Sequence, residues 1–63
     1  MNRKLKVQRF LSGKSQDELA CLMNISQSKI SRIERGCIKP SQAEKEKFAK
    51  ILNVPTEQLF PEQ

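Results

Sequence analysis

The sequence predicts a small all-α domain, and three observations support this fold class. The chain has 63 residues, fewer than the roughly 100–200 that are typical of one domain, so we expect a single domain over 1–63. Two glycines and three prolines interrupt it, and the segments between them are too short for β-α-β units. Those segments also show little alternation of apolar and polar residues, which favours helices over strands.

Helix start and stop signals divide the chain into five expected helices with short connections. Asn2 can cap the first helix, and Gly13 follows its end, because glycine tolerates the left-handed backbone found there. Gly36 ends the third helix in the same way, and Pro55 precedes a short fifth helix. The helices are expected at about 2–12, 16–23, 27–35, 41–52 and 56–60.

Serine residues mark the starts of the three middle helices. Ser15 with Glu18, and Ser41 with Glu44, form the capping-box pattern. In this pattern the Ser side chain accepts a hydrogen bond from an unpaired N–H of the first turn, and the Glu side chain reaches back to the capping residue. Ser26 is expected to cap the third helix.

The second and third expected helices are separated by Asn24, Ile25 and Ser26 alone. A turn this short cannot lay two helices antiparallel, so they must cross steeply, as in a helix-turn-helix motif. Asn24 tolerates the left-handed backbone that ends the second helix. Ala20 is small enough to let the crossing helix approach, and Ile25 can fill the core beneath the turn.

The apolar residues on the inner faces of these helices form the expected core. An apolar stripe on the first helix, made of Val7, Phe10 and Leu11, falls outside that pattern. Either it packs against the fifth helix through Leu59 and Phe60, which is the preferred interpretation, or it is a subunit interface. The expected core consists of Leu5, Leu19, Ala20, Met23, Ile25, Ile30, Ile33, Phe48, Ala49, Leu52, Val54 and Leu59.

Positive charge is concentrated at one end of the chain. The formal net charge is +5, and all of the excess lies in 1–14, which contains five cations and no acid. A basic domain suggests a polyanionic partner, although charge alone also fits a basic helix face in water.

No catalytic or metal site is expected, and therefore neither enzymatic activity nor a cofactor. Histidine, the commonest general base and metal ligand, is absent. Cys21 and Cys37 have too few partners for a metal site, and we expect unpaired thiols in a reducing compartment rather than a disulfide. No apolar run approaches the roughly 20 residues that span a bilayer, and nothing resembles a signal peptide, so we expect a cytoplasmic protein.

The third expected helix has a polar outer face. Ile30 and Ile33 define its core direction at 100° per residue. The major groove of DNA admits one helix, where Gln can pair with adenine and Arg with guanine. The alternative is a polar face that only contacts water. Opposite the core direction lie Ser28, Ser31, Arg32 and Arg35, with Lys29 on one flank and Gln27 at the N-terminal end.

A set of short motifs runs along the chain: SQDELA at 15–20, ISQS at 25–28 and ISRIERG at 30–36, followed by PS at 40–41 and FAKILNV at 48–54. Through these motifs the chain resembles the Cro/repressor-type, or lambda repressor-like, helix-turn-helix family of phage and bacterial regulators. The resemblance covers nearly the whole chain. It implies a five-helix domain that binds operator DNA, usually as a dimer.

The resemblance also implies roles for single residues. Gln27, Ser28 and Arg32 match base-reading positions. Gln16 matches a residue that contacts phosphate at the start of the second helix, where helix N-termini favour anions. Further contacts to the DNA backbone are expected from Ser26, Lys29, Arg35 and Lys39.

Glu34 falls near the core side of the third helix, which is unusual for a carboxylate. The family pattern pairs this Glu with an Arg of the first helix, and Arg9 occupies that position. We therefore interpret Arg9 and Glu34 as a structural ion pair. The alternative is that Arg9 belongs to the basic cluster.

Together these features predict a sequence-specific regulator of transcription that binds double-stranded DNA, a repressor of phage, mobile-element or bacterial origin. The expected target is a pseudo-palindromic operator bound by a homodimer, at least on DNA, with no membrane and no small-molecule ligand. By resemblance the subunits meet around Ile38 and Leu59–Phe60, with the stripe on the first helix as the rival surface. The alternative function is a protein-interaction module, an antitoxin or adaptor, whose binding depends little on salt, whereas DNA binding weakens steeply as salt rises.

Overall fold

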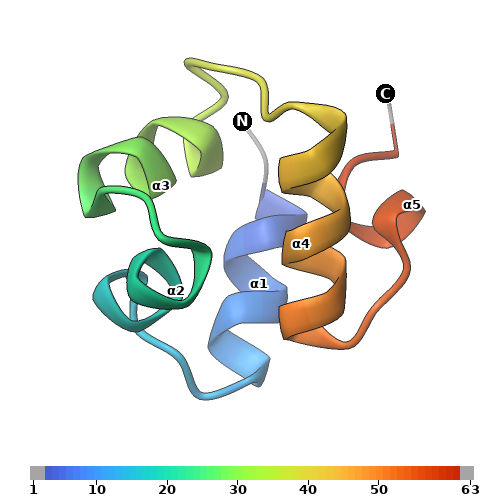
Figure 1. The fold of residues 1–63 in the computed structure, drawn as a ribbon. Coiled ribbons are helices and arrows are strands. Elements are labelled where there is room, and N and C mark those ends of the chain that lie inside the picture. The colour runs from blue at the N-terminus through green and yellow to red at the C-terminus, as the bar shows by residue number, and fades with distance from the viewer. Residues whose placement is uncertain (1–2, 62–63) are drawn as a thin grey trace.

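A computed structural model describes residues 3–61 and confirms the all-α prediction. The described part of the chain forms five helices and no strand (Figure 1). Each helix begins and ends within one residue of its expected bounds, and the expected cap Asn2 lies outside the described residues. The helices are α1 Arg3–Leu11, α2 Gln16–Met23, α3 Gln27–Glu34, α4 Gln42–Leu52 and α5 Thr56–Leu59.

The predicted serine caps of α2, α3 and α4 are confirmed. Ser15 Oγ accepts from the backbone N–H of Glu18 at 3.1 Å, and Glu18 Oε1 accepts from the N–H of Ser15 at 3.0 Å. Ser41 and Glu44 form the same reciprocal pair at 3.2 and 2.9 Å. Ser26 Oγ accepts from the third N–H of α3 at 3.1 Å. These bonds satisfy N–H groups that a helix leaves unpaired in its first turn, so the starts of all three helices are encoded locally.

The turn between α2 and α3 has the conformation that its residues predict. Asn24 adopts φ 60° and ψ 42°, the left-handed region, and its N–H donates back to the end of α2. The N–H of Ile25 donates to the carbonyl of Ala20 at 3.0 Å. Ala20 is buried, as its place at the helix crossing requires. Asn53 ends α4 in the same way, with φ 59°.

One apolar cluster lies among the helices, with α1 and α4 between the α2–α3 pair and α5 (Figure 1). Of the expected core, Ile25, Ala49 and Val54 are partly buried at its edge, and the other residues are buried. Phe60 is an additional core residue, absent from the expected set. Its ring is buried and lies 5.9 Å from the ring of Phe48, centroid to centroid, which ties the end of α5 to α4.

One expectation about apolar surfaces is wrong. Val7, Phe10 and Leu11 are 50, 72 and 75% exposed, so the stripe is not buried against Leu59 and Phe60 at the end of α5, although Val7 lies beside Gln58 of that helix. Leu59 and Phe60 are 0 and 5% exposed and belong to the monomer core, which leaves Ile38, 37% exposed, as the exposed apolar residue of the expected subunit surface. The reason is the rotation of α1: its buried residues turn one face inward, and the stripe lies on the opposite face.

Candidate nucleic-acid interface

The outer face of α3 carries the predicted base-reading side chains. Ile30 and Ile33 are fully buried, and this anchors the helix by its inner face. Gln27, Ser28 and Arg32 are exposed on the described surface. The exposed face of α3 is slightly narrower than the sequence predicts, because Ser31 and Lys29 are half-buried.

The beginning of α3 has no acidic residue in its first turn. The first turn of α2 contains Asp17 and Glu18, and that of α4 contains Glu44. Acids at a helix start offset the positive end of the helix dipole. No acid of α3 itself therefore offsets the positive end of its dipole beside Gln27 and Ser28, which suits a polyanion.

A buried polar network joins the three N-terminal helices. Arg9 Nε donates to Glu34 Oε2 at 2.7 Å, and the two side chains are 9 and 4% exposed. Arg9 also donates through Nη1 to the carbonyl of Lys14 at 2.9 Å. The ion pair expected between Arg9 and Glu34 is therefore present. No buried side-chain nitrogen or oxygen of residues 3–61 lacks a hydrogen-bond partner.

Gln16 belongs to this network, which the sequence analysis did not anticipate. Its Nε2 donates to Glu34 Oε1 at 2.9 Å, so the carboxylate that holds Arg9 also orients the first side chain of α2. The two residues are 18 positions apart, and no local pattern links them. The predicted phosphate-contacting residue is therefore held by α3 itself.

Lys29 also has a partner that the sequence analysis missed. Its Nζ lies 2.6 Å from Glu44 Oε2, with side-chain exposures of 40 and 20%. Glu44 already uses Oε1 in the α4 capping box, so one carboxylate joins the start of α4 to α3. The hydrogen bond from Lys29, followed by that from the Ser41 backbone, lowers the pKa of Glu44 below its usual value. A phosphate would have to compete with Glu44 for Lys29.

The remaining predicted backbone contacts lie around α3. Ser26 is exposed, but its hydroxyl oxygen is already engaged as the helix cap. Arg35 is exposed at the C-terminal end of α3, with Nε 3.4 Å from the carbonyl of Ser31. Lys39 is exposed in the segment that connects α3 to α4. This segment begins after Gly36, which adopts a left-handed φ of 78°.

Nothing among residues 3–61 gathers the ligands of a metal ion, and Cys21 and Cys37 are exposed free thiols. No helix in that range is long and apolar enough to cross a membrane.

Two helices joined by a three-residue turn, the second with a polar outer face, define a helix-turn-helix protein. Comparison with known families agrees: a family model described as a helix-turn-helix domain matches residues 3–61. The chain belongs to this helix-turn-helix family, in keeping with its resemblance to the Cro/repressor type. Membership indicates a DNA-binding regulator, with DNA as its partner, in a class that is typically not enzymatic. A search of curated proteins finds no match.

Proposed function

We propose that this protein is a sequence-specific repressor that reads duplex DNA by placing α3 in the major groove. The observation that carries the proposal is the two-sided character of α3. Ile30, Ile33 and Glu34 hold its inner face, and Gln27, Ser28 and Arg32 stand exposed on the described surface. A helix anchored in this way presents its polar side chains in a fixed orientation, which base recognition requires.

The exposed side chains of α3 have the chemistry that base edges select. Gln27 can pair with adenine through both amide atoms, and Arg32 can donate two hydrogen bonds to O6 and N7 of guanine. Ser28 and Arg32 are four residues apart, so they lie one above the other on the same face. They can therefore reach neighbouring base pairs.

Contacts to the phosphates supply affinity and register in this proposal. Gln16 is held at the start of α2 by Glu34, beside N–H groups and a helix dipole that favour an anion. Ser26, Lys29, Arg35 and Lys39 add contacts around α3. Of these, Lys29 must first leave Glu44. None of these contacts reads the sequence by itself.

We further propose that a homodimer binds a pseudo-palindromic operator. One helix reads only a few base pairs, which is too little for selectivity in a genome. Two copies of α3 one turn of DNA apart, about 34 Å, would double the site that is read. Repression is the proposed outcome because occupancy of a promoter suffices for it, in the bacterial cytoplasm where phage and mobile-element regulators act.

A protein-interaction module, an antitoxin or adaptor, is the second candidate function. The exposed side chains of Val7, Phe10 and Leu11 favour it, because small proteins seldom leave an apolar patch uncovered. Salt separates the two candidates. DNA binding releases counterions and weakens steeply with salt, whereas binding through apolar contacts weakens little.

Selection of bound sequences from a random duplex pool tests the proposal. We expect one enriched motif with two-fold symmetry, bound with an affinity that falls steeply as salt rises. Lys50→Ala removes one charge from the exposed surface of α4 rather than from α3, and it should select the same motif as the parent chain. A pool without any enriched motif would overturn the sequence-specific role, and a motif without an inverted repeat bound one-to-one would overturn the dimer.

A further inference from the structure

The exposed apolar stripe of α1 consists of Val7, Phe10 and Leu11, in which Phe10 and Leu11 follow Val7 by the helical spacings of three and four residues. Half or more of each side chain is exposed, and the two largest are almost three-quarters exposed. Isolated exposed apolar residues are common, but a set of three on one helix face marks a contact surface.

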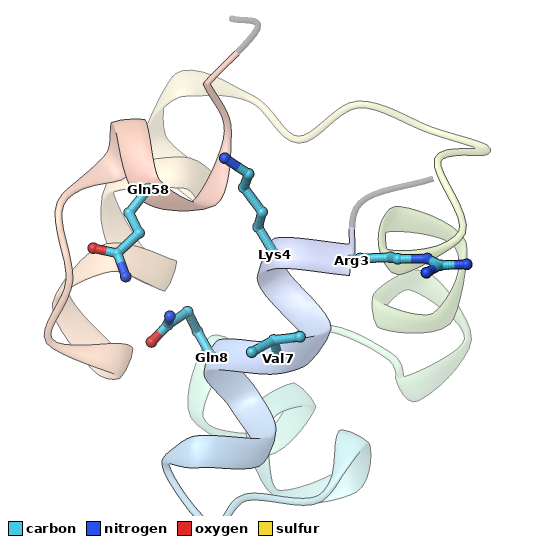
Figure 2. A pocket seen from close by; sticks show the side chains of 5 residues that line it. All are labelled: Arg3, Lys4, Val7, Gln8 and Gln58. Atoms are coloured by element: carbon cyan, nitrogen blue, oxygen red, sulfur yellow. The ribbon is translucent and has the colours of Figure 1, made fainter.

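A groove continues this stripe toward α5. It encloses about 310 Å³ between the two helices and is lined by Arg3, Lys4, Val7, Gln8 and Gln58. Figure 2 shows Gln8 and Gln58 facing each other from α1 and α5, with Val7 at the edge of the groove. Val7 therefore belongs to both features, so the stripe and the groove form one surface. We call this surface the α1 face.

The charge that α1 brings to the α1 face has one sign. Positions 3–14 contain no acid. Arg9 is neutralised by Glu34, but no carboxylate of residues 3–61 forms an ion pair with the other cations of this segment. Those cations are Arg3, Lys4, Lys6 and Lys14. The α1 face is thus an apolar centre with a cationic border.

This charge pattern selects the occupant. A second copy would bring two sets of cations together around the apolar centre, and like charges across an interface oppose association. We propose that the α1 face docks an amphipathic segment of a different protein, with apolar anchors that cover Phe10 and Leu11 and acidic side chains that meet the cations. Amphipathic helices bind apolar grooves through anchors at the same three- and four-residue spacing.

We expect the partner and DNA to bind at the same time when the partner stays on the α5 side of α1. Both views place α1 between α5 and α3, and Figure 2 shows Lys4, Gln8 and Gln58 of the groove on the α5 side, with Arg3 reaching toward α3 (Figures 1 and 2). The inference does not depend on the proposed function, because the acidic segment is recognised whether or not α3 reads DNA. A bound regulator would in this way carry a second protein to the site.

A synthetic peptide tests the proposal on the full chain. The probe is an acidic amphipathic helix of about 16 residues, with Leu and Phe on one face and Glu on the other. Titration into the ¹⁵N-labelled protein should shift the amide signals of Val7, Phe10, Leu11 and Gln58. The same peptide with Lys in place of every Glu should bind at least about tenfold more weakly.

Matched variants separate the apolar and the charged contributions. Phe10→Ser with Leu11→Ser should weaken the acidic peptide about tenfold or more, and Lys4→Glu should weaken it while leaving the apolar stripe intact. Leu22→Ser, which alters an exposed apolar residue of α2, is the control and should bind like the parent chain. Circular dichroism confirms that each variant is folded.

Four results would overturn the proposal. One is equal affinity for the acidic and basic peptides, and another is a set of shifts that map to α3. A third is self-association through Phe10 and Leu11 in sedimentation with no binding of the peptide, which would make a second copy the occupant. The fourth is binding to phosphatidylglycerol vesicles with no binding of the peptide, which would make a lipid surface the occupant.

Discussion

Arg9 Nε lies 2.7 Å from Glu34 Oε2, and both side chains are less than one-tenth exposed, so a buried ion pair joins α1 to α3. Gln16 Nε2 donates to the other oxygen of the same carboxylate at 2.9 Å. Glu34 therefore fixes α3 against α1 and also orients the first side chain of α2. The parts proposed to contact bases and phosphates are coupled through this one carboxylate.

Removing one partner of this pair should be costly. Arg9→Ala leaves a buried carboxylate without its cation, and we expect the free energy of unfolding to fall by about 3–5 kcal/mol. A domain of this size has little more stability than that, so the variant should be largely unfolded. Urea unfolding followed by circular dichroism measures the loss. Arg3→Ala, an exposed cation of the same helix, is the control and should change the free energy little.

The double variant Arg9→Met with Glu34→Leu should recover most of that loss. Apolar residues of similar volume can replace a buried ion pair without the desolvation cost of two charges. If the double variant is as unstable as Arg9→Ala, the cost comes from lost packing rather than from an unpaired charge. The double variant should bind DNA more weakly than the parent chain, because Gln16 loses the carboxylate that orients it.

Lys29→Ala should raise the pKa of Glu44 toward its usual value. The hydrogen bond from Lys29 is the main cause of the lowered pKa, and the Ser41 backbone supplies the next contribution. A lowered folded-state pKa adds stability above the usual carboxyl pKa, and this stability is lost as the pH falls through the folded-state value. The difference in unfolding free energy between parent and variant should therefore shrink in acid. Carboxyl ¹³C titration of Glu44 measures the shift, with Lys50→Ala as the variant that should leave it unchanged.

Glu44→Gln should strengthen DNA binding. The amide keeps an oxygen for the Ser41 N–H, so the cap of α4 survives, but Lys29 loses its ion pair and becomes available to a phosphate. We expect the slope of log affinity against log salt to steepen by about one unit. Glu46→Gln removes the same charge from α4 without touching Lys29 and is the matched control. Equal effects of the two substitutions would point to net charge alone.

Asn24→Ala should lower the free energy of unfolding by about 1 kcal/mol, because the left-handed backbone of the α2–α3 turn disfavours a residue with an ordinary Cβ. Asn24→Gly should be neutral or stabilising. Thermal unfolding of the two variants and the parent chain measures these differences in unfolding free energy. A loss of equal size in both would show that the Asn side chain, and not the backbone conformation, stabilises the turn.

Local signals account for what the sequence predicts well. A capping box such as Ser15 with Glu18, or an Asn after a helix, acts within a few residues, so helix ends can be placed without knowing the fold. The contacts that the sequence analysis missed are long-range. Lys29 with Glu44 and Gln16 with Glu34 depend on how separate helices meet.

The burial of Phe60 could not be predicted from the sequence for a similar reason. It follows α5, which has four residues and is too short for a periodic pattern to show which side faces inward. Its burial against Phe48 is decided by the packing of α4 on α5. The exposure of the α1 stripe likewise depends on which face α1 turns inward, the face of Leu5 and Arg9.

The base preference of Arg32→Ala tests the central claim most directly. Binding of the parent chain, Arg32→Ala and Lys39→Ala should be measured on the selected operator and its single-base variants, at several salt concentrations. We predict that Arg32→Ala loses about 1–3 kcal/mol of binding free energy and its preference at one base pair of each half-site. Lys39→Ala should weaken all sequences about equally and reduce the salt slope by about one unit. If Arg32→Ala loses affinity uniformly and keeps every base preference, α3 does not read bases as proposed.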